Sequence, residues 1–157
     1  MGLDTVNTKI NSIYNRIVDI SRAKGLVGIL ILNKTGSLFF SKIKKNRPNM
    51  VKNNFQIAGF ISAIVIYSQN FIAGDRCGLK LEDIDLGNQH FYIKTKNDII
   101  FAYLVEKNNC SENIERYMQL IMEDFIEKYY YSHVVKFKGD LTPFHNFENV
   151  IEKYFEI

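Results

Sequence analysis

The sequence predicts an α+β protein built on one five-stranded antiparallel sheet, with the strands in the order 2-1-5-4-3 and helices flanking the sheet. Three observations predict this fold class. Segments 26–32 and 99–105 are apolar almost throughout, which is typical of strands covered on both faces. Very short turns connect consecutive strands, so these strands are antiparallel neighbours. A helical segment between the second and third strands can carry the chain across the sheet.

Composition is that of an ordinary globular domain. The chain has 157 residues, of which 46% are hydrophobic and 24% charged. We therefore expect a single domain over 1–157. The formal net charge of +3 is too small to indicate nucleic-acid binding. No apolar run approaches the roughly 20 residues that span a bilayer, and the first residues lack a secretory signal. We expect a cytoplasmic protein without a transmembrane segment.

The first half of the chain predicts a helix, a hairpin and a loop. Apolar residues recur every three or four positions over 4–24, which indicates an amphipathic helix that ends at Gly25. Strand 26–32 follows, and the tight turn 33–36 leads into a second strand, 37–43. Segment 42–52 is polar and basic, and Pro48 is expected to exclude a regular element there.

A second helix is predicted over 54–68, within the region 26–105 that contains the sheet. It is apolar on nearly every side and no charge interrupts it. Such a helix must be covered on more than one face. One cover is the sheet, and the other is either a terminal helix or a partner chain.

Three strands and the C-terminal helices complete the chain. The strands are expected at 79–86, 91–94 and 99–105. The first alternates between apolar and charged residues with a phase slip at Glu82 and Asp83, which indicates a bulged edge strand. The region 111–157 is predicted to hold two helices. Ser111 is the expected cap of the first, and Phe147 begins the apolar spacing of the second.

This order of elements resembles that of longin and roadblock proteins. The residues that carry the resemblance are the hairpin 28–36, the helix segment 59–64, the turns at Gly87 and Asn97, and the segment 138–147 with Phe144 and Phe147. The resemblance covers nearly the whole chain and rests on pattern and order. The leading helix is similar to that of roadblock proteins, while two closing helices are similar to longin domains.

The resemblance implies a protein that is not an enzyme and needs no cofactor. Members of these families act as dimeric platforms for small Ras-like GTPases or as subunits of membrane-trafficking complexes. The implied partners are a second copy of this chain or a paralogous subunit, and a small GTPase.

An interface can be assigned on the same basis. The outer side of helix 54–68 would expose an apolar patch, and roadblock-type dimers join through the equivalent helix and strand. The predicted interface residues are Phe60, Ile64, Tyr67, Leu79, Leu81 and Ile84. The alternative is that a terminal helix covers the patch.

A search for catalytic residues finds no active site. His90, His133 and His145 lack the spacing of metal ligands and are expected at the surface or at its boundary. No glycine-rich phosphate-binding motif occurs. Glu82, Asp83 and Asp85 would suit either a divalent ion or the protection of an edge strand. Cys77 and Cys110 are expected to be free thiols. An enzyme without a recognisable motif stays a third hypothesis.

Two further hypotheses concern binding. Five basic residues occur within eleven positions without an acid, and they could contact anionic lipid or an acidic protein surface, or simply be solvated. They are Lys42, Lys44, Lys45, Arg47 and Lys52. The alternative function is a ligand sensor of the PAS or profilin-like kind, with a cavity lined by Phe91, Tyr103 and Phe125.

Overall fold

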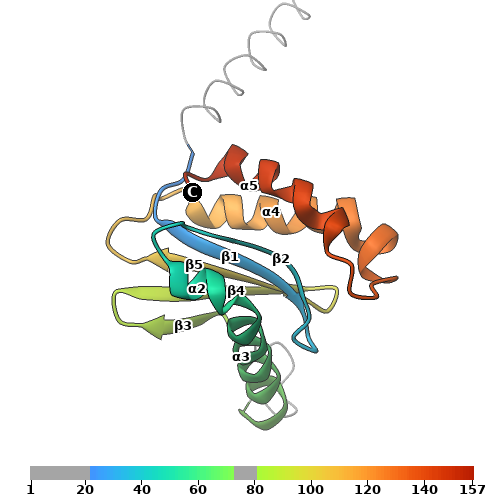
Figure 1. Ribbon diagram of the computed structural model, residues 1–157. Coiled ribbons are helices and arrows are strands. Elements are labelled where there is room, and N and C mark those ends of the chain that lie inside the picture. The colour runs from blue at the N-terminus through green and yellow to red at the C-terminus, as the bar shows by residue number, and fades with distance from the viewer. Residues whose placement is uncertain (1–21, 73–80) are drawn as a thin grey trace, which may run out of the picture.

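The computed structural model describes residues 22–72 and 81–157, and within them five strands form one sheet (Figure 1). The strands are β1 (Leu26–Asn33), β2 (Leu38–Ile43), β3 (Asp83–Leu86), β4 (Gln89–Lys96) and β5 (Ile99–Glu106). All neighbours are antiparallel, and the order is β2-β1-β5-β4-β3. The predicted fold class and strand order are therefore confirmed.

The two most apolar strands, β1 and β5, lie side by side in the middle of the sheet. Ile29 pairs with Tyr103, and Ile31 pairs with Phe101. Seven of the eight residues in each strand are buried. Both faces of this central pair are covered by helices, so apolar side chains are favoured at every position.

Tight turns set the register of the neighbouring strands. In the turn between β1 and β2, Gly36 has a φ of 91°, and the side chain of Asn33 accepts hydrogen bonds from two backbone N–H groups. In the turn between β4 and β5, Asn97 and Asp98 both have positive φ, which suits the right-handed twist of a hairpin. The predicted turns are confirmed at both places.

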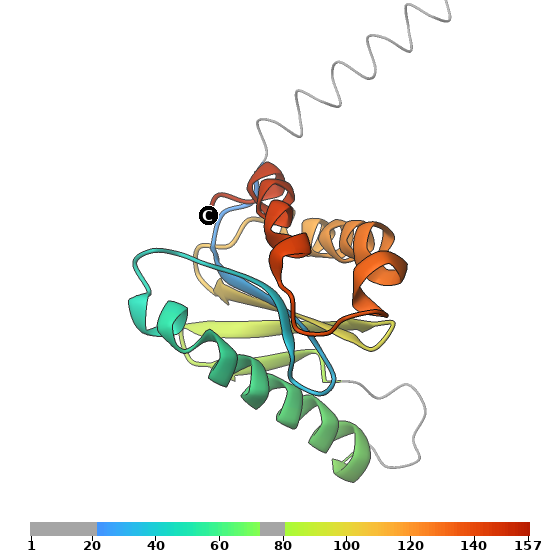
Figure 2. The same ribbon diagram turned by 45° about the vertical axis from the view of Figure 1, so that its right-hand side comes forward.

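Helices cover both faces of the sheet and make three layers (Figures 1 and 2). One face carries α4 (Ile114–Tyr129), the π-helix η2 (Tyr130–Val134), the 3-10 helix η3 (Thr142–Phe147) and α5 (Glu148–Tyr154). The other face carries α2 (Pro48–Lys52), α3 (Asn54–Tyr67) and the π-helix η1 (Ser68–Ile72). The sheet therefore separates two hydrophobic clusters.

The cluster between the sheet and the C-terminal helices is large and aromatic. Phe125 of α4 lies within it, and its ring centroid is 5.1–6.4 Å from five other rings, those of Phe39, Phe101, Tyr129, Phe144 and Phe147. The fully buried Tyr103 donates a hydrogen bond to the carbonyl oxygen of Met118 at 2.8 Å. Burial raises the pKa of Tyr103 well above its ordinary value.

The predicted N-terminal helix lies mostly outside the described residues, and its expected end at Lys24 is wrong. Residues 22–24 are not helical. Ala23 forms a parallel β-bridge with Phe155, and its N–H donates to the carbonyl oxygen of Tyr154 at 2.8 Å. Pairing with the C-terminal segment therefore determines the backbone conformation of residues 22–24. The local periodicity of apolar residues does not.

Two further predictions are also wrong, the absence of a regular element in the loop 42–52 and the cap at Ser111. Pro48 begins α2 inside the expected loop 42–52, because proline lacks the N–H that a first helical residue leaves unpaired. Ser111 does not cap α4, which begins at Ile114. Its hydroxyl oxygen instead accepts the backbone N–H of Lys24 at 2.8 Å. The hydroxyl of Ser111 thus bonds to a residue distant in sequence and does not cap the helix.

The expected edge strand 79–86 is shorter than predicted. Only Asp83–Leu86 is a strand, and residues 79 and 80 lie outside the described part. Ahead of the strand, the carbonyl oxygen of Glu82 still accepts the N–H of Ile93 at 2.6 Å.

The cavity expected for a ligand sensor is not formed by the residues predicted to line it. Phe91 belongs to the cluster beneath α3, whereas Tyr103 and Phe125 belong to the cluster on the opposite face of the sheet. Tyr103 and Phe125 are also completely buried. These three side chains cannot face one cavity, so this prediction is wrong.

Candidate protein interface

Helix α3 carries the predicted interface, and it meets the sheet along a narrow strip. Its buried residues are Ala58, Ile61, Ser62 and Val65. They recur every three or four positions and therefore lie on one face of the helix. No residue of α3 is charged. The rest of its surface is consequently apolar or carries neutral polar groups.

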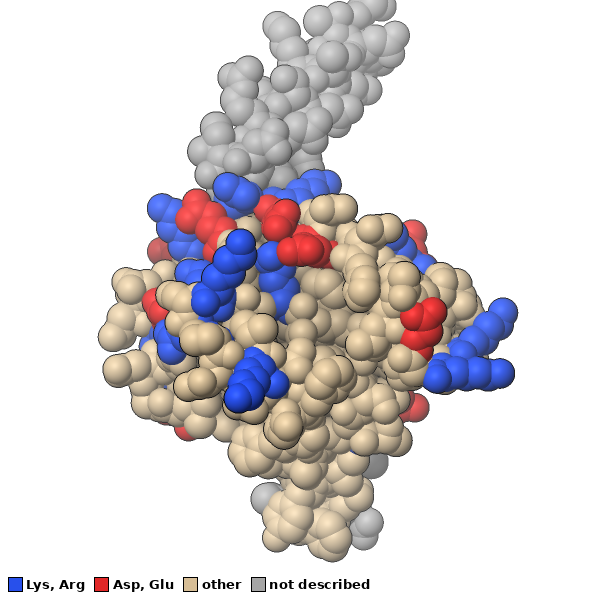
Figure 3. Space-filling view, in the orientation of Figure 1, with Lys and Arg blue, Asp and Glu red and all other residues tan. Residues whose placement is uncertain are grey.

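Large aromatic side chains project from the outer side of α3. Phe60 and Tyr67, both predicted interface residues, are 54% and 58% exposed. Phe71 in η1 is 73% exposed, and its ring centroid lies 5.1 Å from that of Tyr67. In Figure 3, the projecting lower end of the molecule, where α3 lies, shows no acidic or basic side chain. Exposed apolar patches of this kind often mark binding sites for other proteins.

The C-terminal helices do not cover this patch. They pack against the opposite face of the sheet from α3 (Figure 2). The alternative that a C-terminal helix covers α3 is therefore wrong. The corresponding alternative for the N-terminal helix concerns residues outside the described part of the chain.

Polar contacts hold α3 on the β1–β2 hairpin. The hydroxyl of Ser62 donates to the carbonyl oxygen of Lys34 at 2.6 Å. At the start of the helix, Asn54 Nδ2 donates to Ser41 Oγ at 3.0 Å. Gly59 is exposed on the flank of the helix beside the β1–β2 turn, where a Cβ added at Gly36 would meet its Cα at 3.6 Å, and a Cβ added at Gly59 itself would meet no atom within 4 Å. The two hydrogen bonds thus fix the helix on the hairpin, and the missing side chain at Gly59 leaves the space beside it open.

Strand β3 lies at the end of the sheet and shares a hydrophobic cluster with α3. Of the predicted interface residues on this segment, Leu81 and Ile84 are half-buried against that cluster, and Leu79 lies outside the described residues. β3 pairs with β4 on one side, so its other edge is open within the described structure. An open strand edge offers backbone donors and acceptors to a further strand.

One acidic residue of this edge, Asp85, is held by local contacts. Asp85 forms an ion pair with Lys107 at 2.6 Å and accepts the backbone N–H of Gly87 at 3.0 Å. The Lys107 contact, followed by the Gly87 hydrogen bond, lowers the pKa of Asp85 below its ordinary value. Within residues 22–72 and 81–157, no three His, Cys, Asp or Glu side chains converge as metal ligands would.

The structure thus places Phe60 and Tyr67 together on one exposed helix face, with Ile64 half-buried beside them. Their role as an interface stays a prediction. Sequence reasoning did not include Phe55, Phe71 or Leu86, which are also exposed. Phe71 follows Tyr67 by four residues, so an extension of the helical spacing past residue 68 would have found it.

The five basic residues do not form one free patch. Lys42 belongs to β2 and contacts Glu148 at 2.5 Å and Glu152 at 3.3 Å. The hydrogen bond to Glu148 is the main cause that raises the pKa of Lys42. Arg47 forms an ion pair with Glu106 at 3.3 Å.

The other three, Lys44, Lys45 and Lys52, make no ion pair with the described residues. A contact between these side chains and an anionic surface stays a prediction. None of the helices within the described ranges combines the length and hydrophobicity that a bilayer-spanning helix needs.

The histidines occupy three unrelated environments. His90 is more buried than predicted, with 8% exposure, and its ring makes an edge contact with Tyr92. Its Nδ1 has no hydrogen-bond partner among the described residues. His133 lies beside Ser132, and His145 borders a groove along β2. Cys110 is a free, half-buried thiol, and Cys77 lies outside the described residues.

Solved structures with the same fold include two bacterial proteins. A Roadblock/LC7 domain from Streptomyces avermitilis superposes with a TM-score of 0.53 and 14% identity, covering 73% of this chain and 92% of that one. Myxococcus xanthus MglB superposes with a TM-score of 0.54 and 15% identity, covering 80% of this chain and 98% of MglB. No family model and no curated protein sequence matches this chain. The predicted longin/roadblock-like fold is confirmed.

Proposed function

We propose that this roadblock-like chain is a non-catalytic interaction module, which forms a dimer and serves as a platform or regulator for a small Ras-like GTPase. The single observation that carries the proposal is the charge-free helix α3, whose outer side exposes Phe60 and Tyr67, with Phe71 of η1 next to Tyr67, together with the edge of β3 that is open within the described residues. A surface of this composition is costly to leave in water and favours a protein partner.

In the proposed dimer, α3 packs against α3 of a second copy, and β3 pairs with β3. A two-fold axis brings the same surface of both copies together, so Phe60, Tyr67 and Phe71 each contribute twice to the interface. Backbone hydrogen bonds between the strand edges add affinity, and the side chains of α3 set the register.

The GTPase part of the proposal rests on the resemblance to roadblock and longin proteins, which includes the order of the elements and the confirmed fold. A dimer that joins two sheets presents a broad composite surface on which a globular partner can dock. A subunit role in a trafficking-type complex is the other setting that the resemblance supports, and it uses the same helix and strand.

Size-exclusion chromatography with light scattering tests the proposal. The chain has a mass of 18.3 kDa, so a dimer is expected at about twice this value over a series of concentrations. A panel of small Ras-like GTPases, each loaded with GDP or with a non-hydrolysable GTP analogue, should include at least one that co-elutes with the dimer. Tyr67→Glu should shift the protein to the monomer mass. A strict monomer that ignores every GTPase would refute the proposal.

A further inference from the structure

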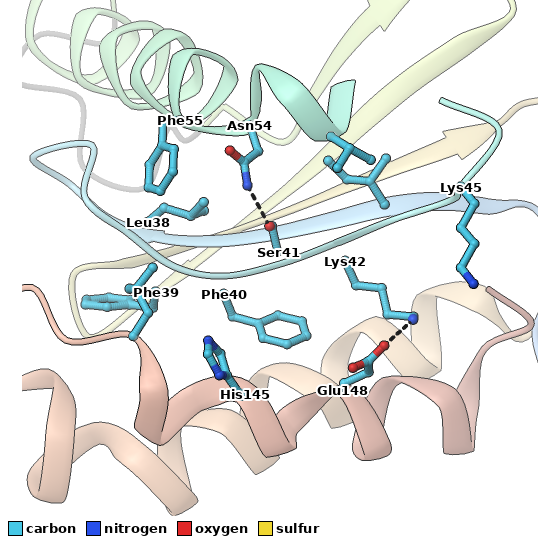
Figure 4. Close-up of a pocket in the computed structure, with 13 residues that line it drawn as sticks. Leu38, Phe39, Phe40, Ser41, Lys42, Lys45, Asn54, Phe55, His145 and Glu148 are labelled. Carbon is cyan, nitrogen blue, oxygen red and sulfur yellow. Dashed lines mark hydrogen bonds and ion pairs between the residues drawn. The ribbon is translucent and has the colours of Figure 1, made fainter. Parts of the chain in front are cut away.

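The sheet has a second edge, formed by β2, and a groove runs along it. The groove encloses about 400 Å³, with β2 as its floor. One wall comes from α2 and the start of α3, and the other comes from η3 and α5 (Figure 4). β2 is an outer strand that pairs with β1 on its inner side. The groove therefore follows a strand edge with which no other described strand pairs, on the side of the sheet opposite β3.

The backbone of β2 presents hydrogen-bonding groups to this groove. The N–H of Lys44 donates to the carbonyl oxygen of Val27 on β1 at 2.9 Å. In an antiparallel pair, every second residue turns its N–H and C=O groups toward the neighbouring strand. The register between the two strands is regular over residues 40–43. Counting back from Lys44, Ile43 and Ser41 turn their backbone groups away from β1 and toward the groove.

The two walls differ in chemistry. On the α3 side, the exposed side chains of Val51 and Phe55 make an apolar wall. On the α5 side, the wall includes His145, Glu148 and the β2 side chain Lys42. An added strand would point alternate side chains toward these two walls. A segment with apolar residues on one face and polar residues on the other fits this geometry.

The charges of the groove favour an acidic segment. The charged residues that line it are Lys42, Lys45 and Glu148. Glu148 is already engaged by Lys42 at 2.5 Å, and Lys42 also contacts Glu152. Lys45 is exposed and makes no ion pair with the described residues, and Figure 4 shows it at one end of the groove. Among the described residues that line the groove, Lys45 is therefore the cation available to a ligand.

We propose that this groove binds an extended segment of a partner protein, in which apolar residues alternate with acidic ones, as an added strand on β2. Backbone pairing with Ser41 and Ile43 supplies the alignment. Apolar side chains of the segment contact Val51 and Phe55, and an acidic side chain pairs with Lys45. This site lies on the sheet edge opposite the proposed dimer interface, so it does not depend on the proposed function.

Selection from a phage-displayed library of random linear peptides against the full chain tests the proposal. The expected result is enrichment of peptides that alternate apolar residues with Asp or Glu. Affinity of an enriched peptide is then measured by fluorescence polarisation. Ile43→Pro should weaken binding about tenfold or more, because it removes a donor that faces the groove while β1 pairing needs no N–H at this position. Methylation of alternate backbone nitrogens in the peptide should have the same effect, whether or not the proline variant folds.

A matched pair of charge reversals tests the role of Lys45. Lys45→Glu should weaken binding about tenfold, and the loss should shrink at high salt. Lys52→Glu makes the same change of charge at an exposed residue that does not line the groove, and it should leave the affinity within about twofold. The proposal is overturned if no peptide is enriched, if enriched peptides lack acidic residues, or if backbone methylation leaves binding intact. It is also overturned if a second copy of the chain occupies the groove, which would appear as a dimer that Ile43→Pro dissociates.

Discussion

Replacement of Phe60 by serine should dissociate the proposed dimer without unfolding the chain. Phe60 is 54% exposed, and a phenylalanine side chain offers roughly 200 Å² for burial, so about 100 Å² is available to a partner. At about 25 cal/mol per Å², covering this area contributes about 2.5 kcal/mol. In a two-fold symmetric dimer the residue counts twice, which gives about 5 kcal/mol when the exposed area is fully covered.

The expected change in the dissociation constant of the dimer depends on how much of this exposed area the partner covers. Full coverage corresponds to a rise in the dissociation constant of a few thousandfold, and half coverage to a rise of about a hundredfold. The monomer should keep its stability within about 0.5 kcal/mol, because the side chain lies at the surface and the buried strip of α3 is unchanged.

Sedimentation equilibrium measures the dissociation constant, and thermal melting at low concentration measures the stability of the monomer. Tyr131→Ser is the matched control, since Tyr131 is 82% exposed in η2, on the other layer of the molecule. Equal dissociation constants for the two variants would show that α3 is not at the interface. A large fall in the melting temperature of dilute Phe60→Ser would show that Phe60 belongs to the core.

Three further predictions concern the folded chain. Phe125→Ala should lower the free energy of unfolding by about 3–5 kcal/mol, because five rings pack against Phe125, and a loss below about 1 kcal/mol in urea titration would contradict this packing. Tyr103→Phe should cost about 1 kcal/mol, since it removes one buried hydrogen bond to a carbonyl that also belongs to α4, and no change by the same assay would argue against that bond. Asp140 accepts the N–H of Thr142 at 3.0 Å, which lowers the pKa of its carboxyl. A lowered folded-state pKa stabilises the protein above the ordinary value of 3.8, and this contribution is lost as the pH falls through the folded-state pKa. The stability difference between the wild type and Asp140→Asn should therefore shrink in acid, and a difference independent of pH would refute the assignment.

The sequence by itself determined the sheet. Segments 26–32 and 99–105 are apolar on both faces, and this property places them at the centre of any sheet that the chain can form. The turns at Gly36 and Asn97 need backbone conformations that few residues adopt, so their positions are also readable in the sequence. These features depend on neighbouring residues, and local physical chemistry is sufficient to predict them.

Tertiary structure decided the contacts between distant segments. Ser111 accepts a hydrogen bond from Lys24, and Lys42 pairs with Glu148, across 87 and 106 residues of sequence. Because of the first contact, Ser111 does not cap α4. Because of the second, Lys42 is not a free cation of the predicted basic loop. The groove along β2 likewise combines residues from separate segments. No local pattern specifies which distant partner a polar side chain will meet.

The exposure of α3 was also decided at this level. A helix that is apolar on nearly every side has no single hydrophobic face, so its sequence does not indicate which side the sheet covers. The sheet covers the side with Ala58, Ile61, Ser62 and Val65, and α4 and α5 pack on the opposite face of the sheet, so they do not cover Phe60 and Tyr67. The candidate interface exists because the larger aromatic cluster holds the C-terminal helices on that other face.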